Sequence, residues 1–130
     1  MAFENAQPPG TTPLSSFNNT TVLTLGLKPN ADSDLNLVIW GRVVIRNLDG
    51  SAQTASATLT TTVQTIDQVD VRIAGDDSSG DPGQSGGQTL SLLGTLRLKP
   101  GDPDNSVQLI CSTFNGFAQE AKLMAFKDPT

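Results

Sequence analysis

The stretch from Asn105 to Lys127, NSVQLICSTFNGFAQEAKLMAFK, decides how this chain is expected to fold. Inward and outward residues alternate with a period of two in each half, as in a β-strand, and a Phe-Asn-Gly-Phe turn separates the halves. The two halves are therefore predicted to form one hairpin. Both faces of this hairpin are apolar. The set that can fill a core is Val107, Leu109, Cys111, Ala121, Leu123 and Ala125, and the opposite set includes Ile110, Met124 and Phe126.

The upstream chain repeats this alternation between turn signals. The Asp49-Gly50 pair favours a tight hairpin because both central positions of that turn need positive φ. Val63 is assigned to a core face, and Gly94 to a bulge or a close packing point. Strands are predicted at 20–27, 35–48, 53–65, 69–73 and 90–98. No segment shows a sustained helical repeat, so we predict an all-β fold, an antiparallel β-sandwich or jelly roll of about eight strands.

The length of 130 residues fits one domain. Residues 1–16 contain several prolines and predict an extended N-terminal arm, while residues 17–130 form the β-sandwich domain. An ordered arm must lie on something, and a neighbouring subunit is one option. No signal-peptide pattern and no apolar run of membrane-spanning length occur, which predicts a soluble chain without membrane insertion. Localisation at an extracellular surface or in a particle is compatible with these features.

Charge and composition exclude several function classes. The net charge of −5 argues against nucleic-acid binding, which needs a basic surface, and against docking on anionic membranes. Cys111 is the only cysteine, so no internal disulfide can form, and its alternating strand predicts a small buried hydrophobe. The chain has no histidine and no tyrosine, so the usual catalytic bases are almost absent and no cofactor is expected. We predict a protein that is not an enzyme.

Two kinds of binding site stay open. Clustered aspartates on loops could bind Ca²⁺ through hard oxygen donors, although aspartate is also a common turn residue. The candidate ligands are Asp76, Asp77, Asp81, Asp102 and Asp104. Trp40, flanked by Arg42, could serve as a platform for sugar binding. The other reading of Trp40 is a buried or interface residue, because it lies in the middle of a strand.

The outward apolar residues are the most informative set. They lie opposite the core set of their own strands: Val38, Trp40, Val44, Ile110, Met124 and Phe126. One explanation is that the arm or a long loop covers the face, or that a bulge shifts the register. The other is a subunit interface, because apolar patches of this size are rarely left wet on a monomer.

Three segments also carry a family resemblance: LVIWGRVVIRNLDGSAQTASATLT, QTLSLLGTLRL and VQLICSTFNGFAQEAKLMAFK. Together they resemble bacterial proteins with a C1q/TNF-like jelly roll, over about residues 35–127. The resemblance implies a compact homotrimer that serves as a binding or display module. The absence of tyrosine departs from the family, whose aromatic residues pack along the trimer axis. Here Trp40, Phe114, Phe117 and Phe126 would have to take that place.

The sequence therefore predicts a structural or recognition module that associates with itself, as part of a larger particle, fibre or surface assembly. Other assembly proteins or glycans are further partners to consider. The alternative is a lectin-like carbohydrate-binding protein, assisted by calcium.

Overall fold

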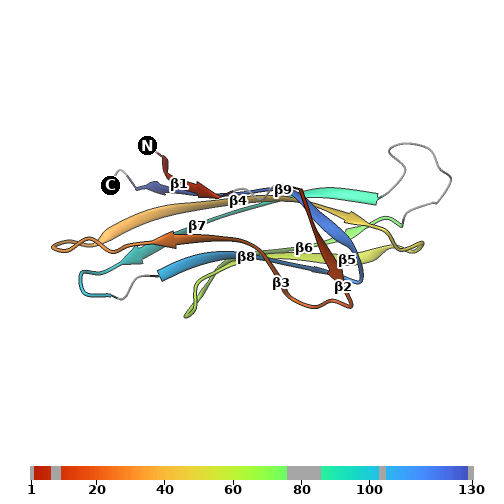
Figure 1. Cartoon of the computed structure of the whole chain (residues 1–130), viewed down its shortest axis with the longest axis horizontal. Helices are drawn as coiled ribbons and strands as arrows, with labels where there is room; N and C mark the ends of the chain where they lie inside the picture. The colour runs from red at the N-terminus through yellow and green to blue at the C-terminus, as the bar shows by residue number, and fades with distance from the viewer. Residues whose placement is uncertain (1, 7–9, 76–85, 103–104, 129–130) are drawn as a thin grey trace.

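Two antiparallel sheets pack face to face in the computed structural model, which describes residues 2–6, 10–75, 86–102 and 105–128 (Figure 1). Sheet A contains β1 (Ala2–Ala6), β2 (Thr11–Ser15), β4 (Leu35–Asn47), β7 (Gly86–Leu98) and β9 (Asn115–Lys127). Sheet B contains β3 (Thr20–Leu27), β5 (Gln53–Thr60), β6 (Thr65–Ile73) and β8 (Asn105–Thr113). These described ranges contain no helix.

The order of the strands is that of a jelly roll. Sheet A runs β1-β9-β4-β7, with β2 also pairing β9, and sheet B runs β3-β8-β5-β6. From β2 onward, β5 and β6 are the one pair of consecutive strands that share a sheet, because every other connection crosses the core. Eight strands in two such sheets make a jelly roll, and β1 adds a ninth. The predicted all-β sandwich is confirmed.

The predicted hairpin between Asn105 and Lys127 is wrong. β8 lies between β3 and β5 in sheet B, whereas β9 lies between β4 and the N-terminal strands in sheet A. The inner residues of β8 and β9 therefore face each other across the core. Alternation identifies which side chains point inward, but it does not identify the neighbouring strand.

The predicted Asp49-Gly50 hairpin is wrong for the same reason, since β4 and β5 belong to different sheets. Gly50 is not among the described residues with positive φ. The fully buried Asn47 side chain holds this crossing instead. Its Nδ2 donates to the carbonyl oxygens of Ser51 at 3.0 Å, Ile73 at 3.3 Å and Ala74 at 3.1 Å. Its Oδ1 accepts the Asp49 N–H at 2.9 Å, so one buried amide fixes the path between the sheets.

The core is built from the alternating inner residues of both sheets, and nearly all the predicted core residues are buried. Val63 is the clearest exception, because it is 83% exposed, and Val69 and Val71 are only partly buried against the core. β5 ends at Thr60, and Thr61 accepts the N–H groups of Val63 and Gln64 on its side-chain oxygen, which forms a turn. Gly94 is a close packing point, because an added Cβ would collide with Ile66 Cγ2 while the β4–β7 register runs unbroken.

The N-terminal arm lies on its own chain. β1 and β2 both pair antiparallel with β9, so they form the outer edge of sheet A. Leu14 of β2 is buried in the core. Residues 11–15 are therefore an integral strand of the sandwich.

Candidate functional site

The outer face of sheet A gathers apolar side chains from neighbouring strands. Val38 of β4 lies opposite Phe126 of β9, and Trp40 lies opposite Met124. All four side chains are half-buried, although they point away from the core that their neighbours fill. The strand pairing thus brings these predicted interface residues together.

Leu93 of β7 belongs to the same group, and the sequence reasoning missed it. It lies opposite Trp40 on the other side of β4, and it is 62% exposed. The inner leucines of this strand occupy even positions, so a leucine at an odd position was the available signal. We call Val38, Trp40, Leu93, Met124 and Phe126 the sheet A patch.

Two predicted interface residues lie outside this patch. Val44 is on the same face, but Arg42 separates it from Trp40, and it is only 7% exposed. Ile110 lies on β8, beside Thr21 and Thr58, on the outer face of sheet B. The six predicted residues therefore do not share one surface, since Ile110 is on the opposite side of the sandwich. Whether the remaining face is an interface stays a prediction.

A bulge in β9 precedes the patch. The β4–β9 register shifts between Arg42 and Val44, where Glu120 adopts a φ of 52°. The inner residues of β9 change there from even to odd positions, from Ala118 to Ala121. The bulge thus keeps both halves of β9 facing the core, and Met124 and Phe126 keep their outward placement.

Charged side chains lie next to the patch on the same face. Arg42 and Lys122 are directly opposite each other, and both are half-buried. Arg46 and Glu120 line a shallow hollow of about 220 Å³ nearby. In the part of the chain that the structure describes, none of these four groups makes an ion pair or a side-chain hydrogen bond.

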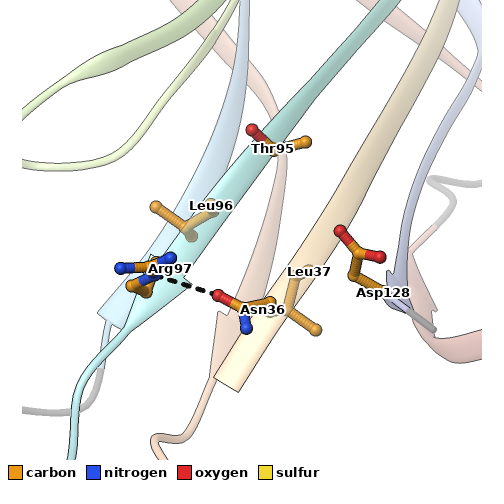
Figure 2. Close-up of a pocket in the computed structure, with 6 residues that line it drawn as sticks. All are labelled: Asn36, Leu37, Thr95, Leu96, Arg97 and Asp128. Carbon is orange, nitrogen blue, oxygen red and sulfur yellow. Dashed lines mark hydrogen bonds between the residues drawn. The ribbon is translucent and has the colours of Figure 1, made fainter. Parts of the chain in front are cut away.

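A second shallow hollow, of about 240 Å³, is lined by residues that include Asn36, Thr95 and Arg97 (Figure 2). It borders the other end of the patch, because Thr95 lies opposite Val38. Arg97 Nε donates to Asn36 Oδ1 at 3.1 Å and lies 3.8 Å from Asp34 Oδ2. These groups give the patch a polar border.

The aspartate candidates for a metal site are mostly outside the described residues: Asp76, Asp77, Asp81 and Asp104. Asp102 is described, and its Oδ2 accepts the Lys99 N–H at 2.7 Å within a turn. Across residues 2–6, 10–75, 86–102 and 105–128, no three acidic or cysteine side chains come together to hold a metal ion. Calcium binding by the loop residues outside the described ranges stays a prediction.

Cys111 occupies the core between the sheets. Burial raises the pKa of its thiol to about 12, so the thiolate is scarce at neutral pH. This agrees with the expected role as a small apolar side chain, and it removes Cys111 as a ready nucleophile.

The outer face of sheet B is polar. Its outward side chains are mainly hydroxyls and amides, including Thr24, Thr54, Ser56, Thr58, Thr60, Gln68, Gln108 and Ser112. Ser56 Oγ donates to Asp70 Oδ1 at 2.8 Å, and Gln68 Nε2 donates to it at 3.2 Å. Ile110 is surrounded by this polar surface.

Another exposed apolar pair lies at one end of the sandwich. The rings of Phe17 and Phe114 are 5.7 Å apart at an angle of 44°, and both are about half exposed. Ser16 N–H and Phe17 N–H donate to the carbonyl oxygens of Phe114 and Thr113, which holds the two turns together. The pair lies away from the patch, at the opposite end of β9.

Comparison with known families and with curated protein sequences finds no match. Among solved structures, the chain is similar to a chain in the structure of the infectious bursal disease virus Gt strain, with 12% identity and a TM-score of 0.49. That alignment covers 94% of this chain and 32% of the viral chain. A second match is the infectious bursal disease virus VP2 subviral particle, with 16% identity, a TM-score of 0.37 and coverage of 88% and 29%. The chain spans about a third of both viral chains, and similarity at this level says nothing about function.

No helix among the described residues has the length and apolar character needed to span a membrane.

Proposed function

We propose that this protein is a non-enzymatic structural or recognition module that associates with itself through the sheet A patch. The observation that carries the proposal is the continuity of the patch. Trp40 lies between Leu93 and Met124 in one row of paired residues, and Val38 and Phe126 form the adjacent row.

The composition of the patch supports this proposal. Aromatic residues and methionine are enriched in the buried centre of protein interfaces, and this patch contains Trp40, Phe126 and Met124. A second copy that covers this apolar surface removes it from water, and this burial stabilises the assembly. Antiparallel sheets with one solvated face are ordinarily polar there, as sheet B is.

A homotrimer is the proposed assembly. The C1q/TNF-like resemblance implies three copies, and a compact trimer would serve within a larger particle, fibre or surface assembly. In such a trimer, Trp40 and Phe126 would take the central aromatic positions.

The test is a pair of matched substitutions followed by light scattering after size exclusion. Trp40→Asp places a charge in the patch, and it should convert the assembly to monomers. Ile110→Asp places the same charge on the outer face of sheet B, and it should leave the assembly intact. An assembled and folded Trp40→Asp variant would show that this face is not the interface.

A further inference from the structure

A basic pair and a lone carboxylate share the outer face of sheet A. Arg42 and Lys122 are opposite each other on β4 and β9, so two positive charges lie side by side in a chain of net charge −5. Glu120 is exposed two residues before Lys122. Within the described ranges, neither the two cations nor Glu120 has a charged or hydrogen-bonding side-chain partner.

Covering this face creates an electrostatic problem. Arg42 and Lys122 are already half-buried, and a second copy that packs on the neighbouring patch would remove more of their water. A buried charge without a partner is strongly unfavourable, so the covering surface has to bring an anion. This step rests on the proposed self-association.

Glu120 is the acidic group best placed to supply that anion. Most other described carboxylates already have partners in their own chain: Asp34, Asp49, Asp67, Asp70, Asp102 and Asp128. Asp32 lies in the loop between β3 and β4. Glu120 alone among the described acids lines the hollow on the same face as the basic pair, next to Val44 and Arg46.

The backbone at Glu120 supports the same assignment. Its φ of 52° lies in the left-handed region, which glycine adopts without strain and a side chain opposes. Strained positions of this kind are concentrated at functional sites. Among the described residues, no ion pair or side-chain hydrogen bond holds the Glu120 carboxylate in its own chain, although Arg46 lines the same hollow, so the carboxylate is available to a group outside the chain.

We propose that Glu120 of one copy forms an ion pair with Arg42 and Lys122 of another copy. In a closed ring, each copy's glutamate meets the basic pair of the next copy. In a two-fold pair, both contacts form reciprocally. The apolar patch provides affinity, and the ion pair makes the association specific for a second copy of this chain.

The test is a charge exchange measured by sedimentation equilibrium. Glu120→Lys and Arg42→Glu each place like charges together, and each should weaken self-association at least about tenfold. The double variant carries both changes and keeps the net charge of −5. It should associate more tightly than either single variant, because the attraction between positions 120 and 42 is restored while the charge of Lys122 is unchanged.

Two controls separate this ion pair from other effects. Asp32→Lys makes the same charge change in a loop, and it should not alter self-association. Circular dichroism of every variant checks that the fold is kept. If Glu120→Lys assembles as well as the unmodified protein, or if the double variant is no better than the weaker single one, the ion pair is refuted. A monomeric unmodified protein would instead refute the proposed function itself.

Discussion

The two outer faces of this sandwich differ, although the same alternation of residues builds both sheets. The outer face of sheet A carries the half-buried Trp40 and Phe126 and the exposed Leu93, whereas the outer face of sheet B carries threonine, serine and glutamine around Ile110. The inner faces are equally apolar. Folding alone therefore accounts for the inner faces but not for an apolar outer face on sheet A, and the proposed self-association would explain the contrast between the two outer faces.

The largest effect is expected in the rates of thiol labelling on the two sides of β8. Cys111 points into the core, and the raised pKa of about 12 lowers its thiolate fraction about 1000-fold relative to an ordinary thiol. The thiol introduced by Ile110→Cys, in a Cys111→Ala background, points to the outer face of sheet B. A thiol reagent at pH 8 should label position 110 at least about 100-fold faster than Cys111, because the scarce thiolate and the closed core both slow the reaction of Cys111. Comparable rates would mean that the inward and outward assignments of β8 are incorrect.

The next effect contrasts a charge placed on each outer face. Phe126→Asp removes an aromatic side chain from the sheet A patch, and truncating an aromatic hot-spot residue near the centre of an interface costs about 2 kcal/mol or more. The dissociation constant of the assembly should therefore rise at least about 30-fold. Thr58→Asp on sheet B is the control and should leave it unchanged. Analytical ultracentrifugation measures the dissociation constants of both variants. An equal rise in both would show that the two outer faces do not differ in their contribution to association.

A smaller effect should follow when sheet B is made to resemble sheet A. Thr58 lies opposite Ile110, so Thr58→Leu creates an apolar cross-strand pair on the polar face. Such a pair changes the free energy of unfolding by about 1 kcal/mol or less. We expect increased binding of an apolar dye and weak additional association. Thr54→Leu, which lies opposite Arg72, should give neither. If both variants bind the dye and associate to the same extent, the polarity of the outer face of sheet B is not what prevents its association with other copies.

The smallest effect concerns the one carboxylate held on the face of sheet B. Hydrogen bonds from Ser56 and then Gln68 lower the pKa of Asp70 below the ordinary 3.8. A depressed folded-state pKa contributes stability above the unfolded value, and that stability is lost as the pH falls through the folded value. Asp70→Asn should therefore be slightly less stable at pH 7 and equal to the unmodified protein in strong acid. Urea unfolding at both pH values tests this, together with an NMR titration, where a pKa of Asp70 above 3.8 would contradict it.

The sequence allowed the inward and outward residues of most strands to be predicted, because alternation is a local property. Val38, Trp40, Met124 and Phe126 were placed on an outward face for this reason, and the structure has them there. Leu93 was missed because the leucines at even positions were enough to predict the strand and its core face.

Strand pairing could not be predicted, because it depends on contacts between distant segments. β8 and β9 follow each other in the chain but lie in opposite sheets, so Ile110 was joined to the wrong set of residues. The buried Asn47 network, which sets one of these crossings, involves carbonyl groups 26 and 27 residues away. The bulge at Glu120 has no sequence signal of its own, since glycine is the residue expected at positive φ.

The most direct test of the central claim is sedimentation equilibrium of the unmodified protein over the micromolar range. A chain that associates through the sheet A patch as proposed should show a mass of three times 13.6 kDa. A mass of 13.6 kDa at every concentration would contradict the account, because the apolar outer face of sheet A would then remain exposed to water.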